Sequence, residues 1–235
     1  MLLLALAQVV KLHAEWSVGG VLQTDETARV AGFSRPQRRA QFLAGRWLAR
    51  RLLCQAVGGA PADWTLSATA GRPPQVLGQP NWRLSVSHSG DWVACALADR
   101  PVGIDLERTN SGRDVAAMAA LVCHPSEAAE LGQLPAAEQE AALIAMWTRK
   151  EAWLKQQSAP FELARMRHLA GLPASMAASC ALTWSSPVPG LALSLAAERV
   201  AEVTPLWPEG CKVLEPACYR LAEQAHEPSR AGRPG

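Results

Sequence analysis

The sequence predicts an α+β protein, because it contains both clearly paired strands and long helices. Residues Asn81 to Ser89 alternate apolar and polar side chains, and Trp92 to Ala98 form a second, apolar strand. The short Ser89-Gly90-Asp91 link between them favours a β-hairpin. Two long segments, Pro36 to Val57 and Ala136 to Gln157, favour helix.

Composition narrows the class of protein. A chain of 235 residues can bury a sizeable core, as one large domain or two smaller ones. Its formal net charge of +2 gives no global nucleic-acid signature. The six cysteines form no CxxC motif, so we expect reduced thiols and no structural zinc. The apolar start, Met1 to Val10, has no basic residue ahead of it and is too short to span a bilayer. We therefore expect a cytoplasmic protein without membrane or nucleic-acid partners.

The first half begins with a buried strand over residues 1–12, followed by a short helix or turn from Asp25 to Phe33. In the helix from Pro36 to Val57, apolar residues recur every four positions on one face, and Gly58-Gly59 ends it. Arginines occupy the opposite face: Arg39, Arg46 and Arg50. Two interpretations are open, a solvated surface or a site for an anion with several phosphates. Seven arginines between residues 29 and 51 favour the second.

The next stretch contains a turn, the hairpin and a strand with two acids. Gly71-Arg72-Pro73-Pro74 is a turn whose prolines fix the backbone. After the hairpin and Arg100-Pro101, residues 103–107 read as a strand with Asp105 and Glu107 on one face. Two neighbouring carboxylates repel each other, so a divalent cation such as Mg²⁺ is the simplest reason for them. The alternative is an exposed face carrying two solvated acids.

The second half follows a polar link at residues 109–113 and begins with helices at 115–122 and 125–131. In the long helix from Ala136, Glu151 and Lys155 are four residues apart and share a face. They could supply a third carboxylate and a phosphate-binding cation, or form a surface ion pair. Strands are expected at residues 181–184, 191–197 and 212–214, and residues 227–235 read as a disordered tail.

Four short motifs occur in a fixed order: Gly71-Arg72-Pro73, Ser87-His88-Ser89, Gly103-Ile104-Asp105-Leu106-Glu107, and the helix from Trp147 to Lys155. Together they resemble the 4′-phosphopantetheinyl transferase family, of the double-length monomeric type that activates surfactin synthetase. The resemblance implies two similar α+β subdomains in a pseudo-twofold arrangement. We place the N-terminal subdomain at residues 1–108 and the C-terminal one at residues 109–226.

The resemblance also implies an activity, namely transfer of the 4′-phosphopantetheine arm of coenzyme A to a serine of an acyl, peptidyl or aryl carrier protein. Asp105, Glu107 and Glu151 would bind Mg²⁺, and Glu151 is either a ligand or the base. Lys155 would neutralise phosphate charge. The residues expected to bind coenzyme A are Arg38, Arg46, Gly71, Arg72, Pro73, Ser87, His88 and Lys155, with Arg29 a weaker candidate.

Two rival functions remain open from the residues alone. An acidic pair with a later Glu and Lys also suits a metal-dependent nuclease. A non-catalytic module that binds coenzyme A or a carrier protein is the other. The chain departs from the family pattern after Lys155, where Gln156-Gln157-Ser158-Ala159 replaces a glycine-containing loop, and at Arg72, which replaces a lysine.

Overall fold

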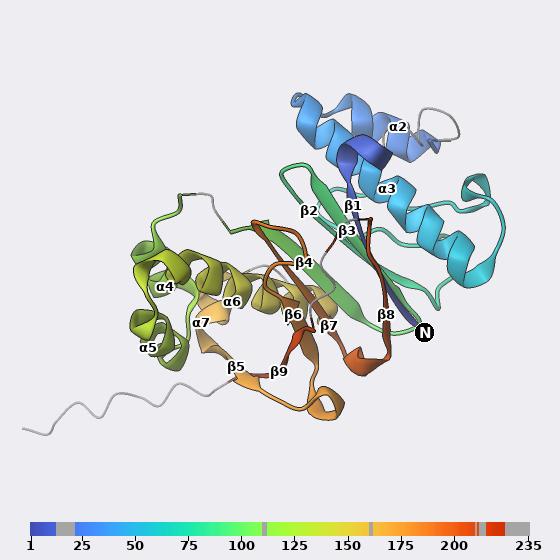
Figure 1. Cartoon of the computed structure of the whole chain (residues 1–235). Coiled ribbons are helices and arrows are strands. Elements are labelled where there is room, and N and C mark those ends of the chain that lie inside the picture. Colours follow the sequence, from blue (N-terminus) through green and yellow to red (C-terminus); the bar gives the residue numbers. More distant parts are fainter. Residues whose placement is uncertain (13–21, 110–111, 160–161, 210, 212–214, 224–235) are drawn as a thin grey trace, which may run out of the picture.

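Two β-sheets pack face to face between two groups of helices in the computed structural model (Figure 1). The structure describes residues 1–12, 22–109, 112–159, 162–209, 211 and 215–223. The expected strand at 212–214 and the expected tail at 227–235 lie outside these residues. No helix in the described part of the chain is long and apolar enough to cross a bilayer.

The first sheet has the strand order β2-β3-β1-β8. β2 (Arg83–Ser89) and β3 (Trp92–Ala98) form the predicted hairpin, and β3 pairs antiparallel with β1 (Leu2–Gln8). β8 (Val203–Leu206) pairs with β1 in parallel. The outer face of this sheet is covered by α3 (Pro36–Val57), to which α2 (Thr24–Ala31) is attached. The bounds of α3 confirm the predicted helix.

The second sheet is antiparallel throughout, with the order β4-β7-β6-β9-β5. Its strands are β4 (Val102–Arg108), β5 (Leu169–Pro173), β6 (Ala181–Trp184), β7 (Leu191–Ala197) and β9 (Ala217–Glu223). The helices on its side of the molecule are α4 (Val115–Val122), α5 (Pro125–Gln133), α6 (Ala136–Gln156) and α7 (Leu163–His168). Three short 3₁₀ turns complete the fold: η1 (Pro61–Asp63), η2 (Met176–Ala178) and η3 (Val200–Glu202).

The two halves share one topology. In each, a strand is followed by a long helix and then a hairpin whose second strand pairs with the first strand: β1, α3, β2-β3 and β4, α6, β6-β7. This repeat fits the expected pair of similar α+β subdomains. The expected boundary at residues 108 and 109 does not match the sheets, however, because β4 opens the second repeat. The division falls before Val102, and β8 returns from the second half to the first sheet.

Alternation along β1 explains how the layers are joined. Leu3 and Ala5 pack with the α3 side of the first sheet, whereas Leu2, Leu4 and Leu6 pack between the two sheets. All five are buried, as predicted, but the strand ends at Gln8 and residues 9–12 are helical, so the strand expected over residues 1–12 is too long at its end. Burying one leucine side chain contributes about 1.5–3 kcal/mol, so this strand contributes strongly to both cores.

The end of α6 is fixed by a left-handed residue. Ser158 has φ of 53°, the one positive φ of a non-glycine residue in the described chain. Its N–H donates to the carbonyl of Lys155, and the N–H of Ala159 donates to the carbonyl of Leu154. These two bonds form a Schellman motif, which usually has glycine at this position. The helix therefore ends directly after the turn that carries Lys155.

Candidate active site

Serine side chains of β2 hold the acidic strand β4 in place. The hydroxyl oxygens of Ser85, Ser87 and Ser89 accept hydrogen bonds from alternate backbone N–H groups of β4, at 3.0, 3.2 and 3.2 Å. Two of these hydroxyls also donate to carboxylates of β4. Ser87 Oγ lies 2.8 Å from Asp105 Oδ1, and Ser89 Oγ lies 3.0 Å from Glu107 Oε2. The polar face of β2, seen in the sequence as alternation, thus joins the two halves of the molecule.

Gly103 lets α6 approach β4 closely. A Cβ atom built on this glycine would lie 1.9 Å from the carbonyl oxygen of Ala152 and 2.5 Å from the backbone nitrogen of Gln156. No side chain fits in that space. The close approach brings Lys155 Nζ to 2.6 Å from Asp105 Oδ1 and 3.2 Å from the carbonyl oxygen of Ile104. A contact between strand and helix backbones therefore positions the charged groups.

The charged groups form a compact network. Asp105 is 2% exposed. Lys155 lies between Asp105 and Glu151, with its Nζ 3.6 Å from Glu151 Oε2. Burial, and then repulsion from Asp105, raise the pKa of Glu151 to about 8. Burial alone lowers the pKa of Lys155, but attraction to Asp105 and Glu151 outweighs it, so the pKa is raised. Lys155 is therefore a cation at neutral pH, whereas Glu151 is mostly protonated there.

The donor set suits a divalent cation in part. Among the described residues, no three His, Cys, Asp or Glu side chains gather closely enough to hold a metal by themselves. Asp105 Oδ2, however, is buried and has no hydrogen-bond partner in the described chain. Glu107 is held by Ser89 and by Arg113, 3.0 Å away. An oxygen without a partner beside a second, partly buried acid fits Mg²⁺, which takes one or two carboxylates and completes its shell with water and phosphate oxygens.

A cavity of about 780 Å³ lies beside this network and contains most of the residues expected to bind coenzyme A. Its lining includes Arg38, Arg46, Gly71, Arg72, Pro73, His88 and Lys155. The lining comes from α3, the 69–75 loop, β2 and the end of α6, so the cavity spans both halves. Ser87 is the exception among the expected binding residues, because it is 8% exposed and points to Asp105. Arg29 also lines the cavity.

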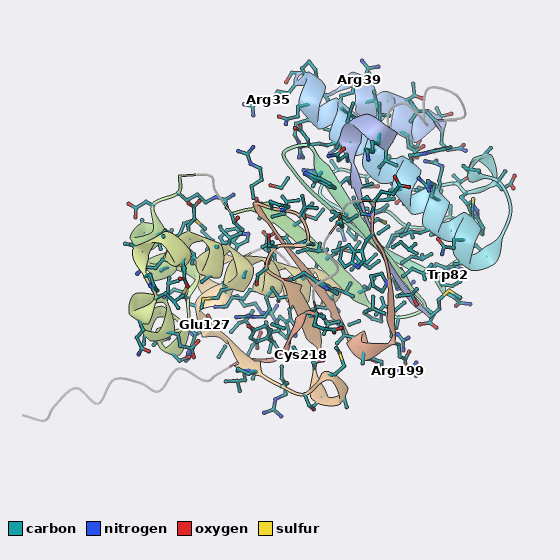
Figure 2. The ribbon with its side chains drawn as sticks, in the orientation of Figure 1. Arg35, Arg39, Trp82, Glu127, Arg199 and Cys218 are labelled. Carbon is teal, nitrogen blue, oxygen red and sulfur yellow. The ribbon has the colours of Figure 1, made fainter. Side chains whose placement is uncertain are left out.

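The predicted arginine face of α3 is not a solvated surface. Arg50 is fully buried and makes two hydrogen bonds to the equally buried Glu26, at 3.0 and 2.7 Å. Arg46 is 7% exposed, lies 3.7 Å from Glu26 and stacks on Phe42. Among these three arginines, only Arg39 projects to solvent, near Arg35 at the start of the helix (Figure 2). Helix periodicity cannot reveal this, because Glu26 lies on a different helix.

Arg46 and His88 have perturbed ionisation for different reasons. Burial, opposed by Glu26, lowers the pKa of Arg46 to about 10, and its Nη1 atom is buried without a hydrogen-bond partner in the described chain. Burial, and then the nearby Arg38, lower the pKa of His88 to about 4. Arg38 Nη1 lies 2.6 Å from His88 Nε2, so the neutral imidazole accepts this bond. His88 is therefore neutral at pH 7, which favours the neutral form over the imidazolium among the two states expected from the sequence.

Sequence reasoning missed a buried ion cluster under the helix that carries Glu151. Lys150 is fully buried, pairs with Glu127 and donates to the carbonyls of Val122 and Met166, at 2.7 and 2.9 Å. Arg149 also pairs with Glu127, at 3.3 Å. Glu127 lies within the helical layer (Figure 2). A hint was available in three consecutive charged residues, 149–151, because an α-helix cannot point all three towards solvent when its neighbours are packed.

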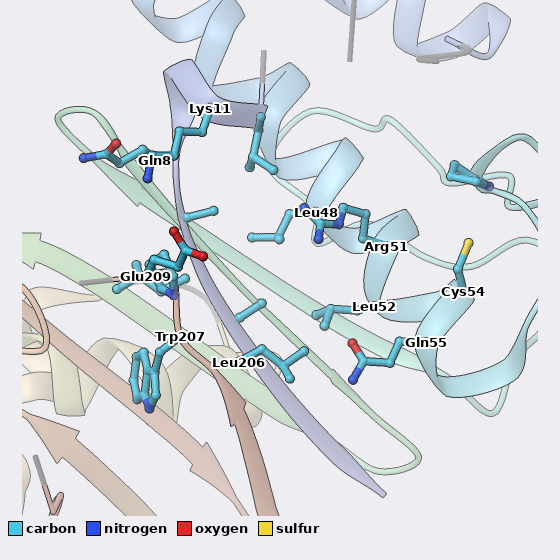
Figure 3. Close-up of a pocket in the computed structure, with 16 residues that line it drawn as sticks. Gln8, Lys11, Leu48, Arg51, Leu52, Cys54, Gln55, Leu206, Trp207 and Glu209 are labelled. Atoms are coloured by element: carbon cyan, nitrogen blue, oxygen red, sulfur yellow. The ribbon is translucent and has the colours of Figure 1, made fainter. Parts of the chain in front are cut away.

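A second cavity, of about 640 Å³, lies between α3 and the β1–β8 edge (Figure 3). Its lining includes Lys11, Arg51, Cys54, Trp207 and Glu209, and none of the predicted site residues. It is separate from the charged network, which lies on the β2 side of the same sheet.

Comparisons with known proteins agree with the geometry. A model described as 4′-phosphopantetheinyl transferase, N-terminal, matches residues 12–101, and one described as 4′-phosphopantetheinyl transferase superfamily matches residues 101–176. The junction between the two models coincides with the start of β4, where the structural repeat begins.

Named relatives point the same way. A 4′-phosphopantetheinyl transferase of Bacillus subtilis is 30% identical over 48% of this chain and 50% of its own length. The 4′-phosphopantetheinyl transferase HetI of a Nostoc species is 31% identical over 59% of this chain and 60% of its own length. The 4′-phosphopantetheinyl transferase AcpT of Salmonella typhimurium is 36% identical over 51% and 59%. The matches thus span between half and three fifths of each of these relatives.

Proposed function

The chain belongs to the 4′-phosphopantetheinyl transferase superfamily, and on that premise we propose that it transfers the 4′-phosphopantetheine arm of coenzyme A to a serine of a carrier protein. The other product is 3′,5′-ADP. The acceptor is an acyl, peptidyl or aryl carrier protein, and the enzyme acts as a cytoplasmic monomer of the surfactin-synthetase-activating type. Neither nucleic acid nor a membrane takes part.

One observation carries the proposal most directly. A cavity lined by arginines ends at Lys155, which also contacts the buried Asp105. Coenzyme A needs cations for its 3′-phosphate and for its pyrophosphate, separated by the length of a nucleotide. Arg46 suits the 3′-phosphate, because its buried Nη1 has no hydrogen-bond partner in the described chain. The turn at Gly71-Arg72-Pro73 would hold the adenine, and Lys155 the pyrophosphate.

The reaction is a substitution at the β-phosphorus of coenzyme A. The serine oxygen of the carrier protein forms a bond to this phosphorus, and the bond from the phosphorus to the bridging oxygen breaks. Glu151, in its carboxylate form, is either the base that takes the serine proton or a third ligand of the metal. Lys155 offsets the negative charge that collects on the phosphate oxygens. Mg²⁺, held by Asp105 and Glu107 and by Glu151 if that residue is not the base, would supply positive charge at the pyrophosphate.

The direct test is transfer of a fluorescent coenzyme A arm to a panel of purified carrier proteins, run beside a plasmid-nicking assay. Labelled carrier protein without nicked plasmid is the expected result. Nicking without labelling would support the nuclease alternative, and coenzyme A binding without either would support a non-catalytic module. Asp105→Ala should abolish transfer while circular dichroism stays unchanged, because the network loses its central acid. Normal turnover of this variant at low Mg²⁺ would refute the metal assignment.

Arg46 has a test of its own. Arg46→Ala should weaken binding of coenzyme A about tenfold or more and leave binding of dephospho-coenzyme A nearly unchanged, because a charge-assisted hydrogen bond contributes about 1.5–3 kcal/mol. The two ligands differ only in the 3′-phosphate. Equal losses for both ligands would mean that Arg46 only supports the packing of α2 and α3 through Glu26.

A further inference from the structure

Ser87 is oriented by the backbone of the opposite strand. Its oxygen accepts the N–H of Leu106 at 3.2 Å, and its hydroxyl hydrogen is directed to Asp105 Oδ1 at 2.8 Å. A serine hydroxyl has a single hydrogen, so donating it to Asp105 leaves none for a ligand. The side chain is also buried and absent from the lining of the coenzyme A cavity.

Asp105 receives donors from two elements on the same oxygen. Ser87 approaches from β2 and Lys155 from α6, both to Oδ1, at 2.8 and 2.6 Å. Two donors at one oxygen oppose rotation of the carboxylate, which would otherwise exchange Oδ1 with Oδ2. The second oxygen stays buried without a partner in the described chain.

We propose that Ser87 is a positioning residue that acts through Asp105, by fixing Oδ1 so that Oδ2 is the oxygen offered to the divalent cation. This rests on the proposed function, and it replaces the direct contact between Ser87 and coenzyme A expected from the sequence. Partners that orient a metal-binding carboxylate typically change metal affinity by about 10- to 100-fold when they are removed.

Ser85 provides a control for the link between the two strands, and because it lines the coenzyme A cavity, the affinity of its alanine variant for coenzyme A is measured separately. Its oxygen accepts the N–H of Ile104 at 3.0 Å, the same bond that Ser87 makes two residues further along, and no carboxylate bond from Ser85 occurs in the described chain. Ser85→Ala and Ser87→Ala therefore remove the same link between β2 and β4. Only Ser87→Ala also frees the carboxylate of Asp105.

The experiment measures three quantities for wild type, Ser85→Ala, Ser87→Ala and Ser87→Thr. They are the melting temperature, the affinity for coenzyme A without metal, and the Mg²⁺ concentration at half-maximal heat release in calorimetry with coenzyme A present. Both alanine variants should lose similar stability. Ser87→Ala alone should need at least about tenfold more Mg²⁺, and Ser87→Thr, which keeps the hydroxyl, should restore most of the affinity.

Several outcomes would overturn the proposal. An unchanged Mg²⁺ midpoint in Ser87→Ala, or an equal shift in Ser85→Ala, would reduce Ser87 to a structural link. Loss of metal-free coenzyme A affinity in Ser87→Ala alone would return Ser87 to direct ligand contact. These results are independent of the transfer assay on the wild-type protein, so failure of the positioning role and failure of the proposed function can be told apart.

Discussion

Replacing Gly103 by alanine should separate α6 from β4 and disable the site. The added Cβ would lie 1.9 Å from the Ala152 carbonyl oxygen, whereas real Cβ contacts almost never fall below 3.0 Å, so the helix must move by about 1.1 Å. A shift of that size would stretch the 2.6 Å contact between Lys155 and Asp105 beyond hydrogen-bond range. Overpacking of this kind costs about 1–3 kcal/mol, and a misplacement of about 1 Å can reduce turnover about 100-fold.

The assay compares Gly103→Ala with Gly132→Ala, which adds the same methyl group elsewhere. A Cβ on Gly132 in α5 would have no atom within 4 Å, so this change should be neutral or slightly stabilising. Thermal unfolding and the rate of phosphopantetheine transfer are measured for both variants. The expected result is a lower melting temperature and about 100-fold slower transfer for Gly103→Ala alone. Wild-type melting and turnover in Gly103→Ala would refute the claim that backbone contact positions Lys155.

Three further changes test the packing and ionisation described above. Ser158→Gly should raise the free energy of unfolding, measured in urea, by about 0.5–1 kcal/mol. Glycine relieves the strain of the left-handed backbone at this position, and this gain exceeds the cost of a more flexible unfolded chain. A loss of stability would contradict this balance. His88→Asn should reduce the loss of stability between pH 6.5 and 4. In the wild type, His88 stays neutral in the folded protein but takes up a proton in the unfolded chain, so protonation favours unfolding as the pH falls. Parallel stability curves for the two proteins would exclude this contribution of His88. Glu26→Ala should lower the free energy of unfolding by about 3–5 kcal/mol, because Arg50 stays charged and buried without its partner. The double variant Glu26→Met/Arg50→Met should lose less stability. A mild effect of the single change would show that water reaches Arg50.

Local sequence patterns were enough to predict several of the helices and strands. The helix at Pro36–Val57, the hairpin and the strands at 181–184 and 191–197 all follow from alternation, helix periodicity and turn residues. β8 could not be found in this way. It is four residues long, contains Pro205 and pairs in parallel with a strand some 200 residues away. β8 forms because β1 offers it an edge to pair with, and that edge exists only after the sheet has formed.

In the site too, some features follow from local sequence and others only from the folded structure. Alternation places Asp105 and Glu107 on one face, and helix spacing places Glu151 with Lys155, so four charged residues were predicted together. The surroundings of Asp105 and Glu107 differ because their hydrogen-bond partners come from other parts of the chain. Lys155 and Ser87 share one oxygen of Asp105, whereas Arg113 and Ser89 occupy Glu107.

Two small residues from different repeats produce this difference in surroundings between Asp105 and Glu107. Ser87 comes from the hairpin of the first repeat, and Gly103 comes from the first strand of the second repeat. The serine fixes the acid from one side, and the glycine admits the helix with its lysine from the other. Each residue is ordinary in its own segment and acts only across the junction. A site formed where two repeats meet therefore keeps its charged residues visible in the sequence, while the residues that orient them become evident only in the structure.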